Sequence, residues 1–376
     1  MNIPITKLTI SKKEEGAACR VIRSGWLMQG KEVAEFEKKF AGYVGARYAV
    51  AVSSGTAALH LALIASGIGP QDEVIVPSFS FIATANAVVH AGARPVFVDI
   101  DPKTYNIDPE KIEGAITRKT KAIMPVHQVG LSADIDRINR SAMKFGLKVI
   151  EDAACALGSE YKGKKIGSLS SLSCFSFHPR KVISTGEGGM VTTNSRLLAD
   201  KITSLRQHYA HYALRSGKAC RQELFPRIGY NYRMTDIQAA IGLVQLSKIS
   251  FLLAKRRRLA LRYDRAFKDK QIFTVPHIPD YATPNYQSYI LRINKNPSLS
   301  RDGLIRHLQK TGIGAKPGIT SIHKQPCYQK VYGRLRLPVT EEATARTLMI
   351  PLYPGLKDKE QDCVIKAALT IARIER

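Results

Sequence analysis

The sequence predicts an α/β protein with a large domain, whose mainly parallel seven-stranded sheet lies between helices, and a smaller C-terminal α+β domain. Short β-branched runs alternate with helical stretches between about residues 35 and 250. Near-continuous apolar strands separated by helices are typical of a parallel sheet covered on both faces. A Pro-rich break at 276–286 and the mixed signals beyond it indicate the second domain. Since the chain has 376 residues and ~150 residues per domain is a reasonable prior, we expect domains at 1–250 and 251–376, with the N-terminal segment free to pack elsewhere.

The predicted strands of the large sheet are short apolar runs bounded by turn residues. They cover 48–53, 73–78, 94–100, 121–127, 147–153, 172–178 and 188–194. Helices are predicted at 56–67, 83–93, about 235–268, 301–312 and 359–374. A further strand at 286–294 belongs to the C-terminal domain. Open parallel sheets bind ligands at the carboxyl ends of their strands, and the unusual residues of this chain fall at those ends.

The charge balance is strongly positive. The chain has 57 basic and 31 acidic residues, a net charge of +26, which attracts nucleic acid, anionic membranes or phosphorylated small molecules. The only dense basic run, Lys255 to Arg258, falls in a helix-like segment, so we interpret it as a solvated face rather than a nucleic-acid patch. A nucleic-acid-binding regulator stays an alternative, although the sequence has neither zinc-finger spacing nor an RNA-binding motif.

The cysteines and the apolar segments predict the cellular compartment of the protein. The six cysteines show neither paired spacing nor a metal-ligand pattern, so we expect reduced thiols and no metal site. The N-terminus lacks the apolar core of a signal peptide. No stretch approaches the ~20 apolar residues that a membrane-spanning helix needs. We therefore expect a cytoplasmic protein without a membrane partner.

The segment Ser54-Gly55-Thr56 follows a predicted strand and opens a predicted helix. Free N–H groups at a helix start, a glycine and a hydroxyl side chain can form a cup for a phosphate. The same residue types also serve as plain helix caps. Alone, the segment leaves both interpretations open.

Two other strand ends carry chemically notable side chains. Glu151 and Asp152 end one strand, where an acid can cap a helix, bind a metal or hold a cationic ligand nitrogen. Phe79 and Phe81 follow another strand, where core packing is the commoner fate of phenylalanine.

Lys181 lies in "SFHPRKVISTGEGGM", between the hydroxyl of Ser176 and a glycine-rich turn at 186–189. A lone lysine is usually a solvated charge, so only distant partners give it a function. A phosphate cup, an acid for a ring nitrogen, an aromatic face and a lysine together fit one ligand, pyridoxal 5'-phosphate (PLP). In that interpretation Lys181 forms the Schiff base, and the acid keeps the ring nitrogen protonated so that the ring accepts electrons.

Ordered motifs along almost the whole chain carry a family resemblance. They are "SGWLMQGKEVAEFEKKFAGYVGARYAVAVSSGTAALHLAL", "DEVIVPSFSFIATANAV", "RPVFVDID", "PVHQVG", "IEDAACALGSEYKGKKIGSLS", "CFSFHPRKVISTGEGGMVTT", "GYNYRMTDIQAAIGLVQL" and "SIHKQPCY". So many motifs in order make a chance match very improbable. The chain resembles the DegT/DnrJ/EryC1/StrS family of sugar aminotransferases, within the fold type I, aspartate aminotransferase-like enzymes.

The resemblance implies a role for each site residue. Lys181 is the Schiff-base lysine and later the acid and base that moves the proton, and Asp152 pairs with the pyridinium nitrogen. The other implied contacts are the phosphate with Gly55, Thr56, Ala57 and Ser176, the ring face with Phe81, the phosphate of a second subunit with Asn231, and the substrate with His323.

Two departures from the family pattern stand out. Cys155 follows "EDAA" where many relatives carry Gln or His, which predicts that a polar contact near the cofactor is missing. The segment 206–227 departs from the usual Arg-Asn-His-Gly sequence, and we expect it to influence substrate choice.

The resemblance implies transamination of a ketosugar, nucleotide-linked, with glutamate as amino donor, by a homodimer with shared active sites. A PLP-dependent sugar dehydratase and a cyclitol aminotransferase of the same family are the nearest alternatives. Dehydrating relatives replace the lysine with histidine, so Lys181 favours transamination.

Overall fold

The computed structural model describes residues 2–214, 221–295 and 299–374. Its largest sheet has seven strands in the order β1-β9-β8-β5-β4-β2-β3. Their bounds are β1 Tyr48–Val52, β2 Glu73–Pro77, β3 Arg94–Val98, β4 Thr120–Ile123, β5 Lys148–Asp152, β8 Leu172–Ser176 and β9 Gly189–Thr193. All seven predicted strands are therefore present in one sheet.

The sheet is mainly parallel, as predicted. Strands β2, β3, β4, β5 and β8 pair in parallel, whereas β9 runs antiparallel to both β8 and β1. Strand β1 consequently ends at the same edge as β5 and β8, and β9 begins there. Loops from four neighbouring strands thus meet at one edge.

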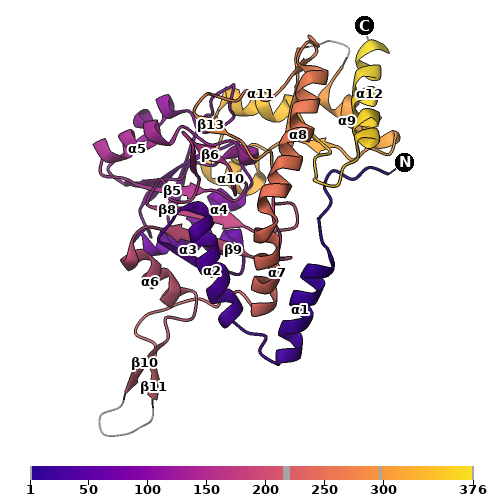
Figure 1. Cartoon of the computed structure of the whole chain (residues 1–376). Coiled ribbons are helices and arrows are strands. Elements are labelled where there is room, and N and C mark those ends of the chain that lie inside the picture. The colour runs from indigo at the N-terminus through magenta and orange to yellow at the C-terminus, as the bar shows by residue number, and fades with distance from the viewer. Residues whose placement is uncertain (1, 215–220, 296–298, 375–376) are drawn as a thin grey trace.

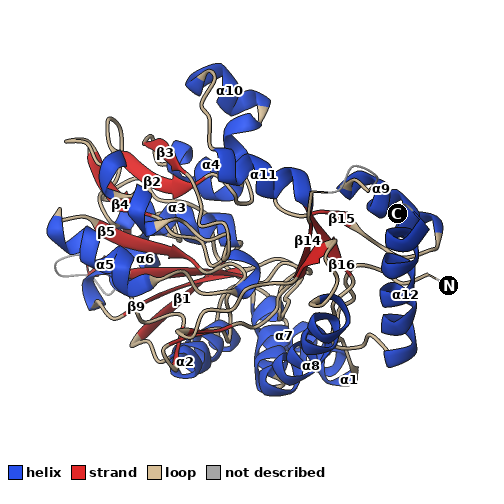
Figure 2. Cartoon of the chain, turned by 90° about the horizontal axis from the view of Figure 1, so that it is seen from above, coloured by secondary structure: helices blue, strands red, loops and turns tan. Residues whose placement is uncertain are grey.

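Helices cover both faces of this sheet. On one face the core contains side chains from α2 (Lys31–Val44), α5 (Ile135–Lys144) and α7 (Asp236–Ser247). The core on the other face contains α3 (Gly55–Ala65), α4 (Ala83–His90) and α6 (Arg196–Leu205). Strand residues alternate between the two cores; Val74 and Val76 face one, and Ile75 faces the other. The result is a three-layer domain (Figure 2).

A second sheet lies beyond the first (Figure 2), with the order β12-β14-β16-β15 and antiparallel pairing throughout. Its strands are β12 Phe273–Thr274, β14 Tyr289–Ile293, β15 Lys316–Pro317 and β16 Thr347–Ile350. The helices of this part of the chain are α8 Ile249–Phe267, α9 Arg301–Lys310, α10 Pro326–Tyr332, α11 Pro338–Arg346 and α12 Asp358–Ile374. Short strands β6 Glu160–Tyr161, β7 Lys164–Lys165 and β13 Ala282–Thr283 form a third sheet.

The two main cores do not divide cleanly at residue 250. Ile3, near the N-terminus, belongs to the core around the second sheet and pairs with Ile313, and Figure 1 shows the N-terminal end of the chain beside α12. Tyr328, on α10, belongs instead to a core of the large sheet. The domain boundary at 250/251 stays a prediction.

The predicted continuous helix over 235–268 is broken. Lys248 has non-helical dihedral angles, φ −99° and ψ 2°, so α7 ends at Ser247 and α8 begins at Ile249. The two helices meet at a bend of 59°. The bend allows α7 to pack on the large sheet and α8 to supply the second core. In the described part of the chain no single helix is long and apolar enough to cross a membrane. Taken together, the two helices of this bent pair have the length and composition of a membrane-spanning segment.

The interpretation of Lys255 to Arg258 as a solvated face is wrong for Arg256. Arg256 is 2% exposed, and Arg257 is half-buried. Arg258 is exposed and pairs with Asp358 at 2.8 Å. The run lies on α8 where that helix crosses from one domain core to the next, so two of its guanidinium groups meet backbone carbonyls instead of water.

Candidate active site

Asp152 is the last residue of β5, at the edge where the loops meet. Its side chain accepts a hydrogen bond from Thr84 Oγ1 at Oδ2 (2.7 Å) and one from the Ala154 N–H at Oδ1 (3.1 Å). Thr84 lies at the start of α4 and also bonds to the hydroxyl of Ser80 at 2.8 Å. Asp152 is 5% exposed, so its carboxylate is oriented before any ligand arrives. Sequence reasoning missed Thr84, which stands three residues after Phe81.

Glu151 points away from its neighbour, as alternation along a strand requires. Its carboxylate accepts from His127 Nε2 at 2.7 Å and from Ser173 Oγ at 3.0 Å. His127 Nδ1 accepts the Ala133 N–H at 3.1 Å, so the ring proton is on Nε2. The described residues contain no group of three or more His, Cys, Asp or Glu side chains that could hold a metal. The buried Glu151 carboxylate therefore links the loop after β4, through His127, to β8, through Ser173.

The predicted phosphate cup lies at the start of α3. Ser54 is the N-cap, and its Oγ accepts the Ala57 N–H at 3.1 Å. The N–H groups of Gly55 and Thr56 have no partner within the helix, because the first turn of any helix leaves its donors free. A Cβ on Gly55 would lie 2.7 Å from Ser176 Cβ and 3.2 Å from Ser176 Oγ. Only glycine allows this approach, which brings the Ser176 hydroxyl beside the helix start.

Lys181 lies in the loop after β8 and is half-buried. Its backbone N–H donates to His178 O at 2.8 Å. Its amine Nζ donates to Cys155 Sγ at 3.1 Å. The sequence predicts that a polar contact is missing at Cys155; here a thiol, a weak hydrogen-bonding group, occupies that position against the amine.

Lys316 is a second lysine near this amine and was not predicted. It begins β15 and is half-buried. Burial lowers the pKa of the Lys316 ammonium, and the charges of Arg180 and Lys181 lower it further, whereas Cys155 acts in the opposite direction. Arg180 and Lys181 are more than a hundred positions from Lys316 in the sequence. Only the tertiary structure therefore reveals this cluster of cations.

The two phenylalanines after β2 differ in environment. Phe79 is 0% exposed and packs against Tyr105, with ring centroids 5.6 Å apart. Phe81 is 73% exposed. Core packing therefore explains Phe79, and Phe81 has a ring face available to a ligand.

His323 is less accessible than a substrate contact requires. It is 1% exposed, and its Nδ1 lies 2.7 Å from Ser78 Oγ while its Nε2 lies 3.3 Å from Glu341 Oε1. Burial lowers the pKa of His323, against the opposing effect of Glu341. The imidazole joins the loop after β2 to α11, and its contact with substrate stays a prediction.

Asn231 is exposed and lies on a segment that runs antiparallel to residues 206–208. Tyr230 and Tyr232 flank it with stacked rings 5.2 Å apart. Beyond residue 208, strands β10 (His211–Leu214) and β11 (Arg221–Leu224) form a hairpin that projects away from the body of the molecule (Figure 1). Part of the predicted 206–227 segment, together with Cys220, lies outside the described residues.

Residues 8–369 match the family model described as the DegT/DnrJ/EryC1/StrS aminotransferase family. The chain is 44% identical to GDP-perosamine synthase from Caulobacter vibrioides over 339 residues, which cover 90% of this chain and 89% of that protein. Its structure resembles Helicobacter pylori PseC, an aminotransferase involved in the biosynthesis of pseudoaminic acid, with a TM-score of 0.93, 30% identity and 100% of both chains covered. It also resembles the PLP-form of the putative sugar aminotransferase Spr1654 from Streptococcus pneumoniae, with a TM-score of 0.93, 29% identity and 100% of both chains covered.

These matches confirm the predicted fold and cofactor. A PLP-binding enzyme of fold type I requires a phosphate cup, a ring acid and a lysine at one sheet edge, and this edge carries a free helix start, a fixed carboxylate and a half-buried amine. The chain belongs to the DegT/DnrJ/EryC1/StrS aminotransferase family and is a PLP-dependent sugar aminotransferase.

Proposed function

We propose that the enzyme aminates a nucleotide-linked ketosugar, with glutamate as amino donor, at the sheet edge that carries Lys181 and Asp152. The observation that supports this most directly is the convergence of three features on neighbouring strands. They are the oriented carboxylate of Asp152, the cup formed by Gly55 and Ser176, and the Lys181 amine. No one of them is diagnostic alone.

PLP supplies an aldehyde and an electron-accepting ring. In our proposal Lys181 Nζ would bond the cofactor aldehyde carbon. Once the amino donor has displaced it, the same atom would move a proton from the donor carbon to the cofactor carbon, and in the second half-reaction from the cofactor carbon to the sugar carbon. Asp152 would accept a hydrogen bond from the protonated ring nitrogen. The free N–H groups of Gly55 and Thr56 with Ser176 Oγ would bind the phosphate, Ala57, whose N–H donates to Ser54 Oγ, would complete the turn, and Phe81 would cover one ring face.

The charge of the chain supports anionic substrates. A net charge of +26 favours the approach of a sugar carrying a diphosphate, and the name of the Caulobacter relative contains a GDP-linked sugar. The carboxylate of an amino donor is one bond from its reacting carbon and must therefore lie near Lys181. Lys316, half-buried among cations, fits that carboxylate.

We also propose a homodimer in which Asn231 completes the phosphate site of the partner subunit. Two segments of the described chain expose large apolar side chains: Trp26, Leu27 and Met28 in one, and Phe225 and Ile228 in the other. A groove of about 900 Å³ is lined by several of these residues together with Arg233. Met28, Phe225 and Ile228 all line this groove. Exposed apolar side chains gathered in one groove typically mark a protein interface, and a second copy of the chain is the occupant we propose.

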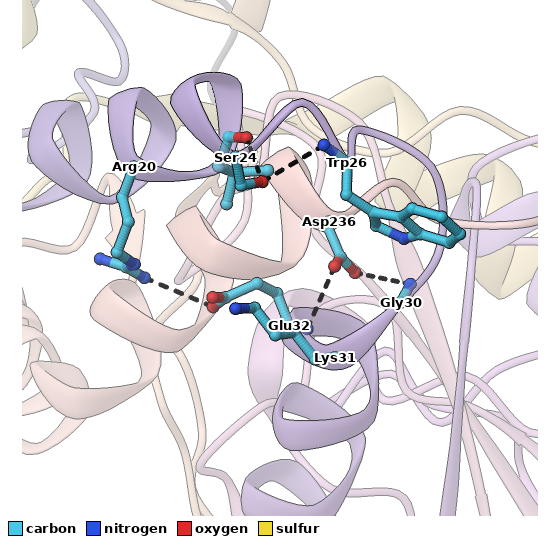
Figure 3. A pocket seen from close by; sticks show the side chains of 8 residues that line it. Arg20, Ser24, Trp26, Gly30, Lys31, Glu32 and Asp236 are labelled. Carbon is cyan, nitrogen blue, oxygen red and sulfur yellow. Dashed lines mark hydrogen bonds and ion pairs between the residues drawn. The ribbon is translucent and has the colours of Figure 1, made fainter.

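A neighbouring pocket of about 460 Å³ indicates how this surface is held (Figure 3). Asp236, the first residue of α7, accepts the N–H groups of Gly30 (2.8 Å) and Val33 (3.0 Å) and so caps α2. Figure 3 shows the Trp26 side chain beside Gly30 and Asp236. A Cβ on Gly30 would lie 2.4 Å from Trp26 Nε1 and 2.8 Å from Asp236 Oδ2, so glycine lets both side chains pack closely against the backbone. The exposed indole thus lies on a turn that Asp236 ties to the start of α7.

The proposed reaction can be tested with glutamate labelled with ¹⁵N in its amino group and a panel of GDP-, UDP- and dTDP-linked ketosugars. We expect mass spectrometry to detect ¹⁵N in one nucleotide sugar only when the enzyme is loaded with PLP. Transfer to a free cyclitol ketone but to no nucleotide sugar would contradict the proposed substrate class. Loss of water from the sugar without ¹⁵N incorporation would contradict transamination.

A further inference from the structure

The segment 284–287, between β13 and β14, contacts both loops that carry groups of the Lys181 site. Asn285 Nδ2 donates to Cys155 O at 2.7 Å and to Leu157 O at 2.9 Å. Gln287 Nε2 donates to Arg180 O at 2.6 Å. Asn285 is 0% exposed and Gln287 is 9% exposed, so water does not compete strongly for these bonds.

The two amide side chains act as one unit. Asn285 Oδ1 accepts the Gln287 N–H at 2.7 Å, which leaves Asn285 Nδ2 as the donor to the carbonyls. The backbone N–H of Asn285 donates to Gly130 O at 3.1 Å. A Cβ on Gly130 would lie 1.7 Å from Asn285 Oδ1, so this loop can approach only because residue 130 is glycine.

The hydrogen bond to Arg180 O orients the peptide group that joins Arg180 to Lys181. A peptide group is planar, so a bond to the carbonyl oxygen of Arg180 also orients the N–H of Lys181, which donates to His178 O at 2.8 Å. The Lys181 amine lies 3.1 Å from Cys155 Sγ, and the backbone of Cys155 is held by Asn285. Both ends of the Lys181–Cys155 contact therefore depend on the same segment.

Two arginines of α8 hold this segment from behind. Arg256 Nη1 donates to Gln287 O at 3.1 Å, and to Tyr286 O and Leu352 O at 3.3 Å each. Arg257 Nε donates to Pro284 O at 3.2 Å. Tyr286 has φ +50°, a left-handed conformation that is uncommon for a bulky residue.

Arg256 is a costly residue to bury. Burial lowers the pKa of Arg256 to about 10, and within the described residues no carboxylate lies at ion-pair distance from it. A buried charge is tolerated when hydrogen bonds replace its water. The carbonyls of 286, 287 and 352 provide them for Nη1, whereas the buried Nε has no hydrogen-bond partner among the described residues. The bonds from Nη1 tie the position of the segment to α8.

We propose that Gln287 and Asn285 are positioning residues that set the distance between the Lys181 amine and the Cys155 thiol. The proposal rests on the assignment of Lys181 as the cofactor lysine. Arg256 and Arg257, in the basic run on α8, hold the segment 284–287 in place. The Asn285 and Gln287 amides of that segment then hold the loops of Cys155 and Lys181.

The test is the rate at which apoenzyme and PLP form the visible absorption band of the Lys181-linked cofactor. Gln287→Leu removes the donor and keeps a similar volume. We expect the rate to fall about tenfold, because a buried hydrogen bond is lost and an acceptor is left unpaired. Gln361→Leu is the matched control, since Gln361 is also buried and its Nε2 donates to Leu259 O at 2.7 Å. The control should lose thermal stability but form the band at the wild-type rate.

A double-mutant cycle separates positioning from general destabilisation. If Gln287 acts through the Lys181–Cys155 contact, Gln287→Leu and Cys155→Ala will be non-additive in the linkage rate. Additive effects, or a Gln287→Leu rate equal to that of Gln361→Leu, would overturn the proposal. Should Gln287→Leu not fold, Gln287→Asn, whose shorter amide stays polar but is retracted from Arg180 O, enters the same cycle. A wild-type enzyme that links PLP at another lysine would instead contradict the proposed function.

Discussion

Asp152 and Lys181 lie at the same edge of the large sheet, but the groups that hold them come from different parts of the chain. Asp152 is held by Thr84 and the Ala154 N–H, both within the large sheet and its helices. Lys181 meets Cys155, and the loops of both residues are fixed by Asn285 and Gln287. The ring acid is thus held locally, whereas the reacting amine depends on a segment next to the second sheet.

This difference fits what each group must do. An acid that holds a ring nitrogen serves best when it does not move, and strand ends provide such rigidity. An amine that releases one partner and takes another must change position during each half-reaction. Its loop is bonded to the segment beside β14 and α8, outside the large sheet that holds Asp152.

The largest effect is expected from removing the amine itself. Lys181→Ala should abolish turnover and the visible band of the linked cofactor, because the amine that bonds the cofactor aldehyde is removed, while the fold survives. Borohydride reduction followed by peptide mapping should label Lys181 in the wild type. A label at Lys162, Lys164 or Lys165 would contradict the assignment.

Replacing Asp152 tests the site residue that is held within the large sheet and its helices. Asp152→Asn should still bind PLP but lose about 100- to 1,000-fold in kcat, because a neutral amide does not keep the ring nitrogen protonated. Thr84→Val, which removes only the hydroxyl that orients Asp152, should cost less. Near-normal kcat in Asp152→Asn would show that Asp152 is a structural acid.

The sequence predicts the locally held side well. Parallel strands end at one edge, so seven apolar runs were sufficient to bring Gly55, Asp152 and Ser176 together. The side that holds Lys181 could not be predicted, because its bonds join residues 107 and 130 positions apart through backbone carbonyls. A carbonyl acceptor has no side-chain signature, so Gln287 and Asn285 read as ordinary polar residues after a Pro-rich break. The same reason explains the wrong interpretation of Arg256, whose partners are also carbonyls.

A second subunit would add a third source of support, and subunit mixing tests it. Lys181→Ala subunits are inactive, and Asn231→Ala subunits should bind PLP weakly. If Asn231 acts across the interface, a mixed dimer has one site with both lesions and one intact site. About half of the dimers in an equal mixture are mixed, so activity should reappear at about a quarter of the wild-type level. Absence of recovery despite proven exchange, or an active monomer, would contradict the shared site.

The smallest predicted effect concerns Lys316, which lies on the side held by the second domain. Lys316→Met should raise KM for glutamate about tenfold, because a charged hydrogen bond to the donor carboxylate is lost, and leave KM for the ketosugar nearly unchanged. Lys201→Met is the matched control: Lys201 is also half-buried with a lowered pKa, but its Nζ donates to Ala65 O at 2.9 Å.

The pH dependence of donor binding provides an independent check on Lys316. Burial and neighbouring cations lower the pKa of Lys316 from the ordinary 10.5, so it loses its charge at a lower pH than an unperturbed lysine does. KM for glutamate should therefore rise with pH before ordinary lysines titrate. In Lys316→Arg this rise should disappear, because arginine stays charged throughout that range. An unchanged pH profile in Lys316→Arg would show that another group binds the donor carboxylate.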